Sequence, residues 1–362
     1  MKANEIFAED LKYIYENLTE RGRLKDSIVF ITGCGGFLGY TILGFLLIHA
    51  RALGLTKVIG IDNFKVGRPL WIKDFETDHK KYFDFYEVDL VSQDLSKIPD
   101  INRVTHVLHM ASIASPTYYR KYPIETIESN VWGLKKLLDF FCSNNLKGFL
   151  FFSSSEIYGN PAADQIPTPE TYHGDVPTIG PRACYDEAKR LGETLSYCYS
   201  LIHGMPVTIV RPFNNYGPGM QMGDGRLPPD LARSVIENRD MIVYSDGTPK
   251  RTFCYVADAV VGYFKSLLHG SFGFFNIGID RPEISVRKLT EIFLLNGRKL
   301  FDYKGQVVFV SPEEKEFLRD NPQRRCPDIS KAKSQLGYDP QIDIEDGVIR
   351  FLKFLKLSEG GI

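Results

Sequence analysis

The sequence lacks an apolar run long enough to cross a membrane. Its most apolar stretch, residues 37–50, is shorter than the roughly 20 residues that a membrane-spanning helix needs, and it contains Gly39 and Gly44. Residues 1–18 are charged from Lys2 onward and contain no apolar core of the length found in signal peptides. We therefore expect a cytoplasmic protein with no membrane partner.

Paired cysteines and an excess of one charge are also missing. The six cysteines form no CxxC pair and have no metal-ligand spacing, so we expect free thiols, a reducing compartment and no metal site. Forty-four Lys and Arg residues face 45 Asp and Glu residues, which gives a formal net charge of -1. This balance offers no general attraction to nucleic acid, so an anionic ligand must be bound by a local site.

What is present is the composition of a folded chain with a substantial core. Its 362 residues are 43% hydrophobic and 25% charged, which excludes a disordered chain and fits one large domain or two closely packed ones.

Short apolar segments alternate with helical segments through the first part of the chain. We predict strands over 27–32, 57–62, 83–88, 104–109, 148–153 and 206–211, and helices over 3–21, from 37 onward, over 124–145 and over 183–203. Parallel strands need long crossovers, and helical crossovers cover both faces of a sheet. The pattern predicts an α/β fold with a Rossmann-like, doubly wound parallel sheet.

A glycine-rich turn separates the first predicted strand from the helix after it. Gly33, Gly36 and Gly39 let the backbone approach a pyrophosphate, while the helix that includes Phe37 and Leu38 directs its N-terminal N–H groups toward the phosphates. The turn predicts a dinucleotide site.

The acidic residue that ends the second strand indicates which dinucleotide binds. Asp62, followed by Asn63, can accept hydrogen bonds from both ribose hydroxyls and would repel a 2'-phosphate, although Lys65 and Arg68 follow closely. We therefore predict NAD rather than NADP. We expect the adenine to lie beside the two residues after the third strand, Asp89 and Leu90.

These signals divide the chain into three parts. Residues 1–27 form a helical extension that packs on the surface, and residues 28–212 form the NAD-binding domain. After Arg211 the sequence becomes rich in Gly, Pro and Asn. Residues 213–362 are expected to form a smaller mixed α/β domain for the substrate, with some segments returning to the first domain.

A tyrosine and a lysine four residues apart supply redox chemistry. Tyr185 and Lys189 lie on one face of the predicted helix, and an ammonium group beside a phenol lowers the phenol's pKa. The tyrosine could then take a proton from an alcohol while a hydride leaves for the nicotinamide, and the lysine could hold the nicotinamide ribose.

The fifth predicted strand ends in polar residues at the edge where such sheets bind ligands. Ser154 or Ser155 can bind the same alcohol that Tyr185 deprotonates. Glu156 is more informative, because a simple oxidoreductase or 4-epimerase needs no carboxylate beside the reacting carbon.

These residues resemble the extended short-chain dehydrogenase/reductase family of nucleotide-sugar enzymes. The segments most similar to its UDP-glucuronate decarboxylase (UDP-xylose synthase) group are residues 109–116, 154–159, 179–190, 222–226, 251–256 and 322–329. The resemblance covers residues 28–355. The sequence differs from the family pattern at Gly219, where an arginine is common.

The resemblance implies a three-step cycle and a homodimer. NAD oxidises the sugar C4 hydroxyl with Tyr185 as base, the resulting β-keto acid loses CO2 from C5, and the ketone is reduced again. The dimer would pair the helices over 124–145 and 183–203 of each subunit.

The resemblance also assigns roles to individual residues. Glu156 and Arg325 act on the carboxylate-bearing part of the sugar and on protonation at C5, although the adjacent Arg324 could exchange roles with Arg325. The remaining substrate-binding residues are Tyr119, near the sugar carboxylate, and Asn214, Arg226 and Arg251, near the UDP group.

Two alternatives remain open. A 4-epimerase or a 4,6-dehydratase of the same family shares the oxidation step, although a dehydratase typically has Asp-Glu where this chain has Ser155-Glu156. A non-catalytic dinucleotide-binding sensor is a more remote possibility.

Overall fold

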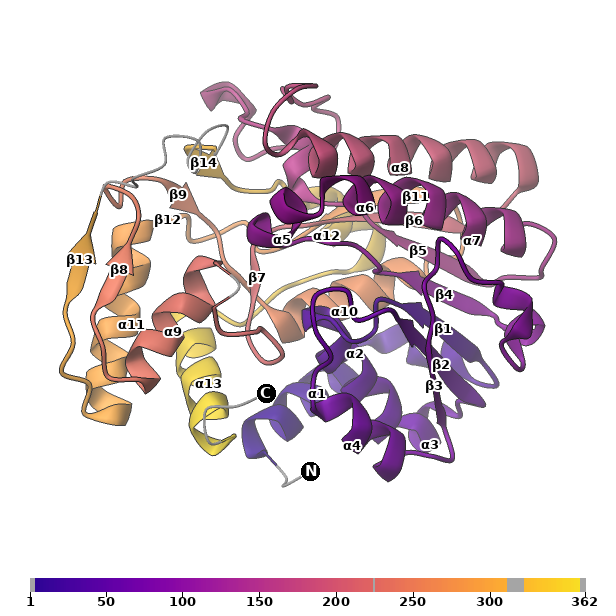
Figure 1. Cartoon of the computed structure of the whole chain (residues 1–362), viewed down its shortest axis with the longest axis horizontal. Helices are drawn as coiled ribbons and strands as arrows, with labels where there is room; N and C mark the ends of the chain where they lie inside the picture. The colour runs from indigo at the N-terminus through magenta and orange to yellow at the C-terminus, as the bar shows by residue number, and fades with distance from the viewer. Residues whose placement is uncertain (1–3, 224, 311–321, 359–362) are drawn as a thin grey trace.

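A seven-stranded sheet with helices on both faces forms the larger part of the molecule, and a smaller lobe lies beside it (Figure 1). The computed structural model describes residues 4–223, 225–310 and 322–358. Asp224, within the motif of residues 222–226, lies outside the described residues.

All pairings in the central sheet are parallel, and the strand order is β11-β6-β5-β4-β1-β2-β3. The strand order reverses beside β1, which is where doubly wound sheets bind ligands. The predicted fold class is therefore confirmed. The strands are β1 (Ile28–Thr32), β2 (Lys57–Asp62), β3 (Phe83–Glu87), β4 (His106–His109), β5 (Gly148–Phe152), β6 (Val207–Pro212) and β11 (Gly273–Ile277).

The apolar sequence of each central strand follows from burial on both faces. Along β1, Val29 and Ile31 pack into one hydrophobic core, whereas Ile28 and Phe30 pack into the core on the opposite face. The strands therefore show continuous apolar runs instead of alternating polar and apolar residues.

One face of the sheet is covered by α2 (Phe37–Ile48) and α10 (Val256–Leu267), and α1 (Glu5–Asn17) packs on both helices. Tyr255, just before α10, donates a 2.7 Å hydrogen bond to Asp10 of α1. The segment containing α1 therefore packs on these helices, and a short 3-10 helix over Thr19–Leu24 follows it.

The opposite face is covered by α8 (Ala183–His203) and by the segment from α6 to α7. The helix α8 has the predicted bounds. The predicted helix over 124–145 is not a single α-helix: α6 (Pro123–Ile127) leads into a π-helical segment (Glu128–Gly133) and then α7 (Leu134–Phe141). Shorter helices flank the strands, namely α3 (Ala50–Leu53), α4 (Trp71–Asp78) and α5 (Pro116–Lys121).

The smaller lobe is built from C-terminal segments. It contains a three-stranded sheet, a two-stranded sheet and three helices: β12 (Ile284–Ser285), β9 (Lys250–Arg251), β14 (Arg324–Arg325), β13 (Val307–Phe309), β8 (Met241–Val243), α9 (Leu227–Ile236), α11 (Val286–Phe301) and α13 (Ile344–Leu357). Strand β11 and the helices α10 and α12 (Ser330–Leu336) belong to this half of the sequence but pack in or on the large sheet.

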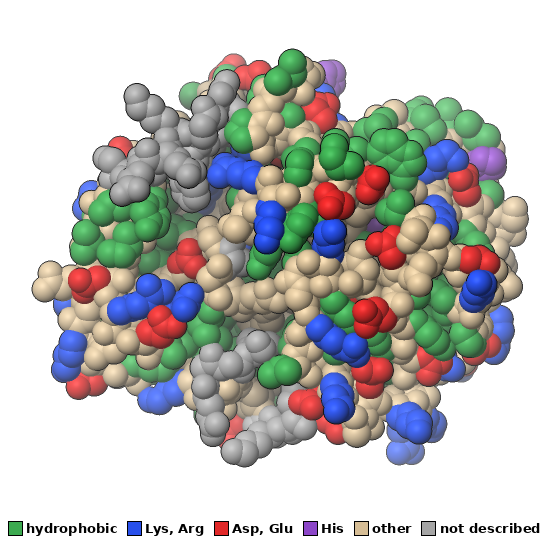
Figure 2. Space-filling view, viewed as in Figure 1, with side chains coloured by type: hydrophobic (Ala, Val, Ile, Leu, Met, Phe, Trp, Pro, Cys, Tyr) green, Lys and Arg blue, Asp and Glu red, His purple; other side chains and the backbone are tan. Residues whose placement is uncertain are grey.

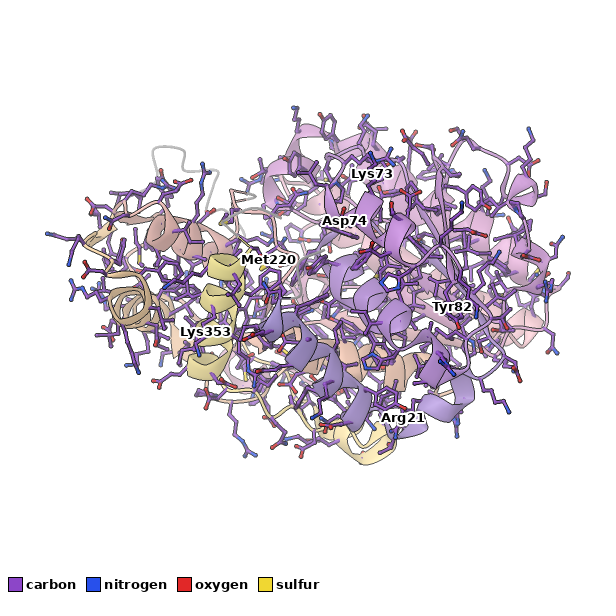
Figure 3. The ribbon with its side chains drawn as sticks, turned by 90° about the horizontal axis from the view of Figure 1, so that it is seen from below. Arg21, Lys73, Asp74, Tyr82, Met220 and Lys353 are labelled. Atoms are coloured by element: carbon purple, nitrogen blue, oxygen red, sulfur yellow. The ribbon has the colours of Figure 1, made fainter. Side chains whose placement is uncertain are left out.

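A loop over residues 217–223 follows the short strand β7 (Asn215–Tyr216). Strand β7 pairs in parallel with β10 (Cys254–Tyr255). Figure 3 labels the loop's buried residue Met220 near the middle of the molecule, toward α13 with Lys353. Gly219 has a φ of +93°, and a side chain there would lie 2.6 Å from the carbonyl oxygen of Phe37. The loop therefore packs directly against the start of α2.

No helix within the described residues is long and apolar enough to serve as a membrane span. All six cysteines are free, as predicted. The cytoplasmic location stays a prediction.

Candidate active site

A cavity of about 590 Å³ opens at the carboxyl ends of β1, β2, β3 and β4. Its lining includes every residue predicted to bind the cofactor outside α8, namely Gly33, Gly36, Phe37, Leu38, Gly39, Asp62, Asn63, Asp89 and Leu90. The structure therefore brings these nine residues together around one space.

The glycine turn allows the backbone to pack closely at this cavity. Gly33 has a φ of +69°, and a side chain there would lie 2.6 Å from the Cα atom of Ala111. A side chain at Gly39 would collide with the carbonyl of Cys34. Gly36 precedes the first turn of α2 and caps it with no side chain. The N–H groups of that turn therefore suit a pyrophosphate.

Asp62 is held in place by the same turn. Its carboxylate accepts hydrogen bonds from the backbone N–H groups of Gly35 at 2.9 Å and Phe64 at 2.8 Å. Burial raises the pKa of Asp62, and these hydrogen bonds oppose that rise. Sequence reasoning missed Gly35, although the signal was present as the second glycine of Gly33-Cys-Gly35.

The cations near Asp62 are paired with acids. Lys65 lies 3.1 Å from Glu125, and Arg68 lies 3.2 Å from Glu87. Their charges are therefore offset locally, beside the Asp62 carboxylate that lines the cavity. Beside it, Asn63 donates a 2.9 Å hydrogen bond to Asp89.

Tyr185, Lys189 and Ser154 meet at the end of β5. The Lys189 ammonium lies 5.6 Å from the centre of the Tyr185 ring and donates a 2.6 Å hydrogen bond to the carbonyl oxygen of Phe152. Ser154 shares a hydrogen bond with Tyr185 and accepts another from the backbone N–H of Glu156. Ser155 is buried beside it at the start of a 3-10 turn.

The electrostatics of this pair correct one expectation. The sequence predicted a lowered pKa for Tyr185 beside Lys189, whereas burial raises the pKa of Tyr185 and the hydrogen bond from Ser154 opposes that rise only in part. Burial also lowers the pKa of Lys189 to about 7. The lysine charge is thus partly lost near neutral pH, because the same desolvation acts on both groups.

Glu156 lies between two guanidinium groups. Arg325 donates to both of its carboxylate oxygens at 2.6 Å, and Arg182 donates to one of them. Burial disfavours ionisation of Glu156, but the two arginines outweigh it and lower its pKa to about 2. Arg324 instead forms a two-pronged pair with Glu283, at 3.0 and 2.7 Å. The geometry therefore separates the two arginines that the sequence left interchangeable.

Tyr119 joins the cluster from α5. Its ring stacks on Tyr185 with 5.3 Å between ring centres. Its buried hydroxyl has no hydrogen-bond partner among the described residues. Burial raises the pKa of Tyr119 to about 12, so the hydroxyl stays neutral.

The other predicted substrate residues lie around this cluster. Arg251 pairs in register with Arg325 and donates to the carbonyl oxygens of Lys250 at 2.7 Å and Gln323 at 3.1 Å. Burial and then Arg325 lower the pKa of Arg251 to about 9.

Arg226 and Asn214 occupy different positions. Arg226 lines the cofactor cavity with its guanidinium over the ring of Phe37. Asn214 donates a 3.0 Å hydrogen bond to the carbonyl of Thr252, so its amide organises the loop next to Arg251.

Sequence reasoning gave no role to two charged residues of α8. Arg182 lies within the segment 179–190 on which the family resemblance rested, and its Nε atom lies 3.5 Å from Asp186. Burial and then the charge of Glu156 raise the pKa of Asp186 to about 7. The sequence signal that could have identified them is their closeness to Tyr185: Arg182 lies three residues before it and Asp186 one residue after it.

Named proteins are similar to this chain over most of its length. Relatives in sequence include UDP-glucuronic acid decarboxylase 1 of Arabidopsis thaliana, 35% identical over 91% of this chain and 70% of that protein. Another is UDP-glucuronic acid decarboxylase 1 of Xenopus tropicalis, 32% identical over 94% of this chain and 74% of that protein.

Solved structures share the fold. The epimerase Mth375 of Methanothermobacter thermautotrophicus has a TM-score of 0.80 at 21% identity, covering 95% of this chain and 96% of that one. UDP-glucose 4-epimerase of Thermotoga maritima has a TM-score of 0.77 at 24% identity, covering 92% and 99%. The sequence model of the NAD dependent epimerase/dehydratase family matches residues 29–278 of this chain. This chain therefore belongs to the NAD dependent epimerase/dehydratase family.

Proposed function

We propose that this protein is an NAD-dependent decarboxylase that converts UDP-glucuronate to UDP-xylose. The observation that carries the proposal is the buried pair of Glu156 and Arg325 near Tyr185. A base, a hydroxyl and a lysine suffice to oxidise and reduce a sugar alcohol, so a 4-epimerase that acts on a neutral sugar does not need this pair. Its presence favours a substrate that carries a carboxylate.

The charge balance of the cluster supports the same substrate. The cluster contains three buried arginines, namely Arg182, Arg251 and Arg325. Its two carboxylates are Glu156, which is ionised, and Asp186, which has a pKa of about 7. Positive charge is therefore in excess near neutral pH. A carboxylate bound by a guanidinium fork restores the balance and gains charge-assisted hydrogen bonds.

The residues around Tyr185 perform the proton transfers. Tyr185 accepts the proton of the C4 hydroxyl, and Ser154 holds both that hydroxyl and the tyrosine oxygen. The charged form of Lys189 favours the tyrosinate. NAD, which the glycine turn at Gly33 and Gly36 and the Asp62 carboxylate would hold, would supply the hydride acceptor for this oxidation and the hydride for the final reduction, so the reaction would consume no external oxidant.

The C4 ketone makes the loss of CO2 possible. When the bond between C5 and the carboxyl carbon breaks, its electron pair moves toward the ketone oxygen, and the protonated Tyr185 can donate a hydrogen bond there. Carbon C5 then gains a proton. We assign binding of the carboxylate to Arg325 and control of the C5 protonation to Glu156.

Mass spectrometry of the products tests the proposal. Incubation with UDP-glucuronate and NAD should release CO2 and yield a UDP-pentose, and Tyr185→Phe should abolish both. A product of unchanged mass would mean epimerisation and would contradict the proposal. Near-normal turnover by Tyr185→Phe would show that the base is wrong.

We also propose that the protein forms a homodimer through α8 and the segment over 123–141. Exposed apolar side chains gather on these helices, as the green side chains over α8 in Figure 2 illustrate. They are Ile124, Trp132, Leu191, Tyr197, Leu201 and Ile202. A four-helix interface would cover them.

Sedimentation with a matched pair of variants tests the dimer. Ile202, 73% exposed on α8, and Leu295, 62% exposed on α11, are similar apolar surface positions. Ile202→Glu should produce monomers, whereas the wild type and Leu295→Glu should sediment as dimers. A monomeric wild type would refute this arrangement.

A further inference from the structure

Arg182 is built into the helix that carries the proposed base. Its backbone carbonyl accepts hydrogen bonds from the N–H groups of Tyr185 at 2.9 Å and Asp186 at 3.1 Å, in the first turn of α8. Its side chain reaches Glu156 in the turn after β5. One residue therefore connects the position of the Glu156 carboxylate to the helix that positions Tyr185.

Arg325 approaches the same carboxylate from a different part of the molecule. It lies on the two-residue strand β14, which pairs with β9 in the smaller lobe. Both of its terminal nitrogens are engaged by Glu156. Under the proposed function, the sugar carboxylate must either displace Glu156 from the Arg325 guanidinium or share that guanidinium with it. The contact between Arg325 and Glu156 therefore changes when substrate binds.

Arg182 differs because a second carboxylate holds it. Asp186, one turn along α8, lies 3.5 Å from its Nε atom. Both side chains are buried, and the Oδ1 atom of Asp186 has no hydrogen-bond partner among the described residues. Loss of Arg182 would leave two buried carboxylates close together with less compensation, which is strongly unfavourable. Arg182 is therefore the permanent partner of Glu156.

We infer that Arg182 is a positioning residue that holds the Glu156 carboxylate in register with Tyr185 while Arg325 binds the carboxylate of the substrate. The inference rests on the proposed function, because it needs a substrate carboxylate. Arg182 does not bind that carboxylate; it acts through Glu156, and Asp186 keeps its guanidinium in place.

Kinetics of a double-mutant cycle test the inference. Arg182→Gln should lower kcat about 10- to 100-fold, as expected when a reacting group is misplaced by about 1 Å, and should change KM less than about threefold. Arg325→Gln should chiefly raise KM. Arg182→Gln should add no further loss to Glu156→Gln, because its effect passes through Glu156. Arg182→Lys, which keeps the charge but not the fork, should recover part of kcat.

The control is Arg324→Gln, which removes the neighbouring pair with Glu283. Its effect should add to that of Glu156→Gln, because the two side chains do not share a partner. A kcat loss from Arg182→Gln that persists in full in the Glu156→Gln background would overturn the inference. So would a rise in KM as large as that of Arg325→Gln, because Arg182 would then bind the substrate directly.

A titration without substrate separates this inference from the proposed function. The carboxyl signal of Glu156, assigned in labelled protein by comparison with Glu156→Gln, should titrate at higher pH in Arg182→Gln than in the wild type. Glu156 also faces Arg325, Arg251, Asp186, Tyr119 and Tyr185, and all of them remain in this variant. An unchanged titration would overturn the inference. A wild-type product of unchanged mass would overturn the proposed function instead.

Discussion

Glu156→Gln should destabilise the protein far more than Glu283→Gln, although each glutamate forms a two-pronged pair with an adjacent arginine. Arg325 and Arg324 follow each other in β14, and they bind Glu156 and Glu283 respectively. The arginine side chain is 10% exposed in the first pair and 39% exposed in the second. The two glutamates are similarly buried, so the pairs differ in the exposure of the arginine and in Arg182, the second guanidinium that contacts Glu156.

The pKa of Glu156 gives the size of the expected effect. It falls from an ordinary value of 4.5 to about 2, and each unit corresponds to about 1.4 kcal/mol. The ionised carboxylate thus contributes about 3 kcal/mol to the free energy of unfolding. Removing one partner of a buried ion pair costs about 3–5 kcal/mol, which agrees with this value. A pair whose arginine reaches solvent contributes about 0–1 kcal/mol, and we expect that for Glu283 because its partner Arg324 is 39% exposed.

The dependence on pH follows from the sign of the shift. Because folding lowers the pKa of Glu156, its contribution is complete above the unfolded value near 4.5 and disappears as the pH falls through about 2. Urea unfolding at pH 7 should therefore show a deficit of about 3 kcal/mol for Glu156→Gln, which should shrink to about 1 kcal/mol at pH 3. Equal losses for the two variants at pH 7 would refute this reasoning.

Three further variants test other parts of the structure. Lys189→Met should be inactive, yet at pH 6 it should be more stable than the cofactor-free wild type. Burial lowers the pKa of Lys189 to about 7, so below that pH the folded wild type bears the full cost of burying the lysine charge. A lower melting temperature of the variant at pH 6 would contradict this. Asp62→Asn should shift the ratio of the NAD and NADP dissociation constants about tenfold in favour of NADP. Removing the carboxylate relieves about 1.4 kcal/mol of repulsion between Asp62 and the 2'-phosphate of NADP. Titration calorimetry measures this ratio, and an unchanged ratio would show that Asp62 does not select NAD over NADP. Gly219→Ala should lower the free energy of unfolding by about 2–3 kcal/mol, and Gly204→Ala by about 1 kcal/mol. Both glycines have positive φ angles, but only Gly219 has backbone atoms within 4 Å of the added carbon. Equal losses in denaturant unfolding would rule out the close approach to α2.

Strong local patterns made much of the fold predictable. Strands such as β1 and β5 are apolar throughout because both of their faces are buried, and α8 has clear helical spacing and ends before Gly204 in a left-handed conformation. Strand β11 was not predicted, because its place beside β6 depends on a long-range parallel pairing that local sequence does not encode. The π-helical segment within the predicted helix over 124–145 was missed because helical spacing in the sequence does not distinguish a π-helical turn from an α-helical one.

The candidate site was predictable where a motif carries its own chemistry. The glycine turn, Asp62 and the pair of Tyr185 and Lys189 were predicted from their spacing together with the strands and helices expected around them. The clamp of Arg182 on Glu156 could not, because it joins residues 26 positions apart through side chains alone. The raised pKa of Tyr185 was likewise out of reach, since it depends on burial, which spacing does not reveal.

The most direct test of the central claim uses UDP-glucuronate that carries deuterium at C4. If a transient C4 ketone activates the bond to the carboxyl group, the wild type should release CO2 and yield a UDP-pentose that retains the deuterium at C4, because the same hydride leaves and returns. Turnover should also be slower than with the unlabelled substrate wherever the oxidation limits the rate. Release of CO2 with the deuterium lost to solvent, or a labelled product that still contains the carboxylate, would contradict the account.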